Sequence, residues 1–180
     1  MERKWETVSK KIIYDNDRYK IRLDKVKGFE GIERDYAFIE KSDAVVIIAL
    51  EEDCIYFLKQ YRYPVNKVLL QLPAGALDGK DMHQAAREEL EEETGITAKN
   101  WTFLGKFHPL SPRQTSTTHV FLATGLNTSN ITIDKQSEYE TIQSIEKISI
   151  TELKDMIRSN KIECGESLAS LTLFFLNSKL

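Results

Sequence analysis

The sequence has few cysteines, little net charge and no long apolar run. Its 180 residues include two cysteines, Cys54 and Cys164, which lie far apart without metal-type spacing. We interpret both as small buried apolar side chains. The formal net charge of −3 offers no basic field to hold a phosphate backbone, so a DNA or RNA partner is disfavoured.

No stretch is apolar for long enough to span a bilayer, which needs about 20 residues. The longest apolar run covers residues 44–50 and fits a buried strand. The N-terminus is charged and interrupted, unlike the apolar core of a secretion signal. We therefore expect a cytoplasmic protein with no membrane partner. The 41% of apolar and 29% of charged residues are typical of a folded domain.

Strand-like patterns dominate the N-terminal half, and helical periodicity appears in the middle and at the end. Residues 19–26 alternate with period two. Residues 81–94 carry apolar side chains every four positions and stop before Gly95, which predicts a helix. This order of elements predicts an α+β, or mixed α/β, layered domain. The predicted strands cover residues 19–26, 34–39, 44–50, 54–61, 101–107, 118–123 and 142–150, and two later helices begin at the N-cap Thr151 and cover residues 165–176.

The predicted central helix carries an acidic cluster. Glu89, Glu92 and Glu93 are three and four positions apart, so they share one helix face and repel each other. A divalent cation would relieve that repulsion, and Mg²⁺ prefers such oxygen ligands. The alternative is a solvated acidic surface. The preceding loop, residues 72–79, contains Pro and Gly residues that can place backbone carbonyls beside the carboxylates, which favours a metal site.

These residues resemble the signature of the Nudix hydrolases, G-x5-E-x7-R-E-U-x-E-E-x-G-U, where U is a bulky aliphatic residue. The resemblance implies the Nudix fold, in which mixed β-sheets are sandwiched between helices. It also implies that the three glutamates hold Mg²⁺, with Mn²⁺ as an alternative, and that the backbone carbonyl of Ala74 assists them. The matching residues are Gly75, Glu89, Leu90, Glu92, Glu93, Gly95 and Ile96.

The chain departs from that signature in one charged pair. Its loop is one residue shorter, so the first signature glutamate falls on Lys80 and the signature arginine falls on Glu88. Arg87 cannot replace that arginine, because one position turns the helix by about 100°. Our hypothesis is that the charges are exchanged and the loop still forms a salt bridge with the helix. The alternative is a weakened or lost activity.

The flanking segments resemble the ADP-ribose pyrophosphatase branch of the family. Residues 57–65 and 71–75 match its strand and its E-L-P-A-G motif, with Gln71 in place of the glutamate. Ser111 and Pro112 match the loop that follows the signature in this branch, although Arg113 stands where glycine is usual. The resemblance implies an N-terminal β-region, residues 1–40, that pairs two subunits in a homodimer, and a hydrolase domain over residues 41–180.

The same resemblance implies hydrolysis of ADP-ribose or another nucleoside diphosphate sugar, with a late-loop glutamate acting on water. Glu140 is the first candidate for that base and Glu138 the second; the alternative for each is a solvated carboxylate. Arg62 and Arg113 are candidates for phosphate contact, and Tyr61 for stacking on a base, although surface and core roles remain open. A nucleoside triphosphate or dinucleotide is an alternative substrate, and a non-catalytic nucleotide-binding module is the alternative class.

Overall fold

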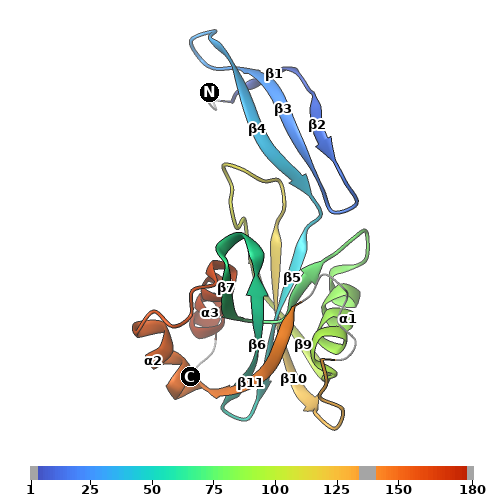
Figure 1. The fold of residues 1–180 in the computed structure, drawn as a ribbon, viewed down its shortest axis with the longest axis vertical. Coiled ribbons are helices and arrows are strands. Elements are labelled where there is room, and N and C mark those ends of the chain that lie inside the picture. Colours follow the sequence, from blue (N-terminus) through green and yellow to red (C-terminus); the bar gives the residue numbers. More distant parts are fainter. Residues whose placement is uncertain (1–3, 134–140, 178–180) are drawn as a thin grey trace. The chain divides into compact units, whose positions relative to one another are not determined.

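The computed structural model describes residues 4–133 and 141–177 and divides the chain into two compact units (Figure 1). The first unit consists of Met1–Asp43 and His108–Thr117. The second consists of Ala44–Phe107 and Thr118–Leu180. No helix in the described ranges is long and apolar enough to cross a membrane.

The first unit is an antiparallel sheet. Strands β3 (Tyr19–Lys27) and β4 (Glu33–Lys41) form a hairpin, and β1 (Glu6–Ser9) and β2 (Ile12–Asp15) pair in succession along the other edge of β3. The loop His108–Thr117 lies along β4, where the Ile39 N–H donates to the Arg113 carbonyl at 2.7 Å. β1 and β2 were not predicted, because all their residues are exposed and their sequence lacks an apolar alternation.

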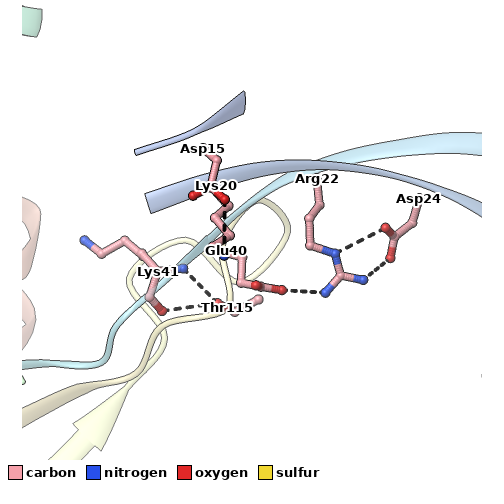
Figure 2. Close-up of polar contacts among 7 residues, drawn as sticks. All are labelled: Asp15, Lys20, Arg22, Asp24, Glu40, Lys41 and Thr115. Carbon is pink, nitrogen blue, oxygen red and sulfur yellow. Dashed lines mark hydrogen bonds and ion pairs between the residues drawn. The ribbon is translucent and has the colours of Figure 1, made fainter. Parts of the chain in front are cut away.

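Charged side chains cross the face of this sheet (Figure 2). The Arg22 guanidinium donates to both carboxylate oxygens of Asp24 and to Glu40 Oε2 at 2.6 Å. The same guanidinium lies over the Phe38 ring, 4.7 Å from its centroid. These contacts allow the carboxylate of Asp24 to be buried, because a buried charge needs a partner of opposite sign.

The second unit contains a seven-stranded mixed sheet. Its main path runs β11 (Ile142–Ser149), β6 (Cys54–Arg62), β5 (Ala44–Glu51), β10 (Thr118–Asn127) and β9 (Thr97–Phe107). The β5–β10 pair is parallel, and the remaining pairs are antiparallel. Two short strands complete the sheet, β7 (Lys67–Gln71) beside β6 and β8 (Ala74–Ala76) beside β5.

Helices cover both faces of this sheet, as Figure 1 shows: α1 (Met82–Thr94) lies on one face, and α2 (Ile150–Arg158) and α3 (Gly165–Asn177) on the other. Alternate residues of β5 enter different cores, with Val45 and Ile47 packing in the cluster of α1 and Val46 and Ile48 in the cluster of α2 and α3. Each fully buried Val or Ile contributes about 1.5–3 kcal/mol. The predicted mixed α/β layering is confirmed.

The predicted strands and helices of the second unit are present, with differences in bounds: β9 begins at Thr97 rather than residue 101, and β10 ends at Asn127 rather than residue 123. The N-cap of α2 lies two residues earlier than predicted, at Ser149, whose extended backbone lets its hydroxyl accept from the Glu152 N–H; Thr151 lies inside the helix. β7 and β8 were missed because they are short and flank Pro73. Cys54 and Cys164 are half-buried, so the prediction of full burial was wrong.

Candidate active site

The segment between β7 and α1 is fixed at successive residues. The Leu72 N–H donates to the Ser167 hydroxyl of α3 at 3.0 Å, and the Pro73 carbonyl accepts from the Ile47 N–H at 2.9 Å. The next residues, Ala74–Ala76, pair with β5 as strand β8. Contacts from β5 and α3 therefore hold the backbone that precedes the acidic helix.

Helix α1 has well-defined ends. Asp81 caps its first turn by accepting from the N–H groups of His83 and Gln84, at 2.9 and 3.3 Å. Gly95 ends it in the left-handed region, at φ 69°, as the sequence predicted. Ala86 and Leu90 are buried on the face toward the sheet, so the rotation of the acidic residues is set by core packing.

Glu89 lies directly against the backbone of Gly75. A Cβ atom at residue 75 would stand 1.9 Å from the carboxylate carbon of Glu89 and 2.1 and 2.2 Å from its oxygens. Only glycine leaves this space, which gives a physical reason for the residue that opens the signature. The sequence pattern suggested this approach, and the structure places the two groups together.

Glu93, one turn later, is buried, with 2% of its surface exposed. Its Oε2 atom accepts from the Ala74 N–H at 2.9 Å. Glu89 and Glu93 therefore converge on two successive residues of β8, and the peptide that joins them contributes the carbonyl of Ala74. Carboxylate and carbonyl oxygens are hard ligands, so this donor set fits Mg²⁺ or Mn²⁺ in its chemistry.

Glu92 is exposed on the neighbouring turn. Within residues 4–133 and 141–177, no three His, Cys, Asp or Glu side chains stand close enough together to form a metal site as they lie. The structure thus brings Glu89 to Gly75 and Glu93 to Ala74 and leaves Glu92 on the solvent side.

The predicted exchange of charges on the loop and the helix is present. Lys80 Nζ donates to Glu88 Oε2 at 2.5 Å, and Gln84 donates to the other oxygen of Glu88 at 2.9 Å. The Glu88 carboxylate raises the pKa of Lys80, and the Lys80 ammonium lowers the pKa of Glu88. The turn that joins β8 to α1 is therefore tied to the helix two turns beyond its start.

Arg62, at the end of β6, is held by β7. Its Nε donates to Gln71 Oε1 at 3.0 Å, and the Gln71 amide donates to Gln60 Oε1. Both glutamines are buried. Sequence reasoning named Arg62 but missed its partners, although a glutamine at an inward strand position was the available signal.

The side-chain hydroxyl and the backbone carbonyl of Tyr61 already have hydrogen-bond partners. Its hydroxyl donates to Asn66 Oδ1 at 3.0 Å, and its carbonyl accepts from the Thr141 hydroxyl at 2.6 Å. Arg113 belongs to the first unit, where its N–H donates to the Leu110 carbonyl at 2.9 Å. The base candidates Glu138 and Glu140 lie outside the described residues.

Comparisons with known proteins agree with this geometry. Residues 40–166 match the family model described as NUDIX domain. The chain is 28% identical over 155 residues to the ADP-ribose pyrophosphatase of Bacillus subtilis (strain 168), covering 85% of this chain and 81% of that protein. It is 32% identical over 128 residues to the ADP-ribose pyrophosphatase of Mycobacterium tuberculosis, covering 69% and 62% respectively.

A solved structure has the same fold. A crystal structure of an ADP compounds hydrolase superposes with a TM-score of 0.81, covering 95% of this chain and 92% of that one at 19% sequence identity. The Nudix fold expected from the sequence is therefore confirmed.

Proposed function

Because this chain belongs to the Nudix hydrolase family, we propose that it cleaves the pyrophosphate bond of ADP-ribose or a related nucleoside diphosphate sugar with the help of Mg²⁺. The products would be a nucleoside monophosphate and a sugar phosphate. The observation that carries the proposal is the convergence of Glu89 and Glu93 on Ala74 and Gly75. The ADP-ribose pyrophosphatases among the similar proteins support the substrate class.

The chemical difficulty is the negative charge of the diphosphate, which repels an incoming hydroxide and makes the departing phosphate a poor leaving group unless its charge is neutralised. Glu89, Glu93 and the Ala74 carbonyl would hold the ion, and Glu92 would join them from the adjacent turn. The bound ion supplies positive charge to the phosphoryl oxygens and makes a water molecule more acidic. Mn²⁺, with the same preference for oxygen, is an alternative to Mg²⁺.

Other side chains would orient the substrate and move the proton. Arg62 projects from the sheet that carries β8 and can offer its planar guanidinium to a phosphate. We assign the proton acceptor to Glu140, with Glu138 as the second candidate. Arg113 remains a candidate for substrate contact. Tyr61 is a weaker candidate for stacking, since its hydroxyl already bonds to Asn66.

We also propose that two subunits pair through the N-terminal β-region, residues 1–40. The edge formed by β1 and β2 exposes Ile12, Ile13 and Tyr14. An exposed apolar strand edge is a common site of strand pairing between chains. Sedimentation analysis of the full chain would test this, with a monomer at micromolar concentration as the contradicting result.

The direct test is hydrolysis of ADP-ribose, GDP-mannose, UDP-glucose and a nucleoside triphosphate with Mg²⁺, with products identified. Release of a monophosphate and a sugar phosphate is expected. Products from the triphosphate alone would favour the alternative substrate class. Absence of turnover with retained nucleotide binding would favour a non-catalytic module.

Site variants test the metal centre. We expect Glu92→Gln and Glu93→Gln each to lower turnover by at least about a hundredfold, as for lost support of a catalytic ion. Gly75→Ala should leave the fold intact, since the Glu89 side chain can rotate away, but weaken Mn²⁺ binding in calorimetry. Glu91→Gln is the matched control, because position 91 is exposed and lies off the shared face. Near-normal turnover of both Glu92→Gln and Glu93→Gln would remove the metal site from the mechanism.

A further inference from the structure

Three side chains form a hydrogen-bonded row on one face of β6 and β7. Gln60 and Arg62 are alternate residues of β6, and Gln71 ends β7, where it stands opposite Leu58. The Arg62 side chain extends back along the strand to reach Gln71, at 3.0 Å from Nε to Oε1. Gln71 in turn donates to Gln60.

The donors and acceptors that each side chain carries fix the direction in which the hydrogen bonds of this row run. A guanidinium can only donate, so Gln71 must turn its oxygen toward Arg62 and its NH2 toward Gln60. Gln60 and Gln71 are 1% and 3% exposed, so each needs partners inside the protein. The two amides therefore hold the guanidinium in one orientation, as a packed and satisfied polar network does.

The row links Arg62 to the residue that begins the segment leading to the proposed metal site. Gln71 directly precedes Leu72 and Pro73, which α3 and β5 hold in place, and Ala74 follows. All the partners belong to the second unit. Within the described residues, the polar contact of the Arg62 side chain is with this neutral amide, and no ion pair to a carboxylate is present. No carboxylate of the described residues therefore offsets the charge of the guanidinium while Gln71 holds it.

We infer that Gln71 is a positioning residue that aims Arg62 at a phosphate of the substrate without neutralising it. This inference rests on the proposed function and specifies which residue positions the arginine that would contact the substrate phosphate. The glutamate usual at this position in the branch that the chain resembles would also hold the arginine, but its charge would offset part of the attraction of the guanidinium for an anion. The amide orients the guanidinium and leaves its charge for the ligand.

The test compares Gln71→Glu, which keeps the contact and adds a charge, with Gln71→Leu, which removes the contact. For ADP-ribose hydrolysis we expect Gln71→Glu to raise KM about tenfold, the scale of one charge-assisted hydrogen bond, with kcat nearly unchanged. Its KM should also depend less on salt than that of the wild type. Gln71→Leu should raise KM about threefold through loss of orientation, and Arg62→Lys should do the same.

A second measurement separates this role from a structural one. The Kd of ADP-ribose in the presence of EDTA, where no hydrolysis occurs, should rise in parallel with KM. In an Arg62→Gln background, both Gln71 variants should cause no further change, because residue 71 acts through the arginine. Lys59→Gln is the matched control, since it removes a cation from the same strand that is engaged with Glu146 at 3.0 Å.

Two results would overturn the inference. One is an unchanged KM and Kd in both Gln71 variants. The other is an equal shift of KM in the presence and in the absence of Arg62. A wild-type chain that neither hydrolyses nor binds ADP-ribose would instead contradict the proposed function, so the two failures are distinguishable. Gln71→Leu keeps the test decisive if a carboxylate at residue 71 unfolds the chain.

Discussion

In the second unit, β5 lies between two apolar clusters, whereas in the first unit Val26 is the one buried apolar side chain among the described residues. The first unit instead relies on contacts between polar and aromatic groups. Arg22 joins Asp24 and Glu40, and Trp5 packs edge-on against Tyr36 with ring centroids 5.6 Å apart (Figure 2 shows the charged group). Removing apolar volume and removing charge should therefore affect the two units differently.

The difference matches the demands on each unit. The proposed metal and phosphate site would tolerate little displacement, since a misplacement of about 1 Å can cost a hundredfold in rate. Core packing on both faces of one sheet gives β8 and α1 that precision. A sheet with exposed apolar edges has fewer internal constraints and more surface to offer another molecule.

The largest expected effect comes from the core of the second unit. Phe57→Ala should lower the free energy of unfolding by about 3–5 kcal/mol, because the ring is completely buried and leaves a cavity. Phe38→Ala in the first unit should cost less, roughly 1–2 kcal/mol, since that ring is already partly exposed.

The chain offers a separate probe for each unit. It contains two tryptophans, Trp5 in the first unit and Trp101 in the second. In urea titrations of single-tryptophan variants, Phe57→Ala should shift the Trp101 transition and Phe38→Ala the Trp5 transition. Equal shifts of both probes in both variants would mean that the units unfold as one and that the comparison is wrong.

The second-largest expected effect comes from removing a charged side chain of the first unit. Arg22→Leu should destabilise the Trp5 transition by about 3 kcal/mol, because Asp24 would be left buried without its guanidinium. Adding Asp24→Asn should recover part of the loss, since an uncharged amide costs less to bury. Arg22→Leu alone with an unchanged Trp5 midpoint would show that this pair does not hold the sheet.

An exposed ion pair of the second unit should behave in the opposite way, affecting rate rather than stability. Lys80→Glu and Glu88→Arg should each lower turnover about tenfold, because like charges then push the turn away from α1. The double variant should recover most of the turnover while the Trp101 midpoint stays constant. A double variant whose loss of turnover is the sum of the two single losses would contradict the exchanged-charge explanation.

Sequence patterns predicted the strands and helices with strong signals, because burial on both faces makes β5 a continuous apolar run, while burial of one face imposes period 3.6 on α1. The weak elements failed for physical reasons. β8 is held by pairing with β5 and by Glu93, contacts that are distant in sequence and invisible to a local pattern. The cap of α2 was misplaced because Ser149 and Thr151 both fit a cap, and only the backbone decides between them.

The candidate site was predicted unevenly for a similar reason. The spacing of Glu89, Glu92 and Glu93 is enough to predict that they share one face of a helix. It could not show that Glu93 is buried against Ala74 while Glu92 faces solvent, since that depends on where the sheet lies. The Gln60–Gln71 contact joins residues from two strands, and only their register brings them together.

The smallest expected effect is an acid sensitivity of the second unit at Glu51. Lys147, and then the hydroxyl of Tyr56, lower the pKa of the Glu51 carboxylate below its ordinary value of 4.5. A carboxylate with a lowered folded-state pKa adds stability above its unfolded pKa, and that stability is lost as pH falls through the folded value. Lys147→Met should therefore lower the Trp101 urea midpoint slightly at about pH 7 and leave it equal to the wild type well below about pH 4. The effect should be small because both side chains are partly exposed, at 42% for Lys147 and 29% for Glu51.

The control is the Trp5 midpoint, which should not respond to this substitution at either pH. A parallel shift of the Trp5 midpoint would contradict the independence of the two units. A difference in the Trp101 midpoint that persists in acid would mean that Lys147 acts through packing on Tyr56 rather than through charge.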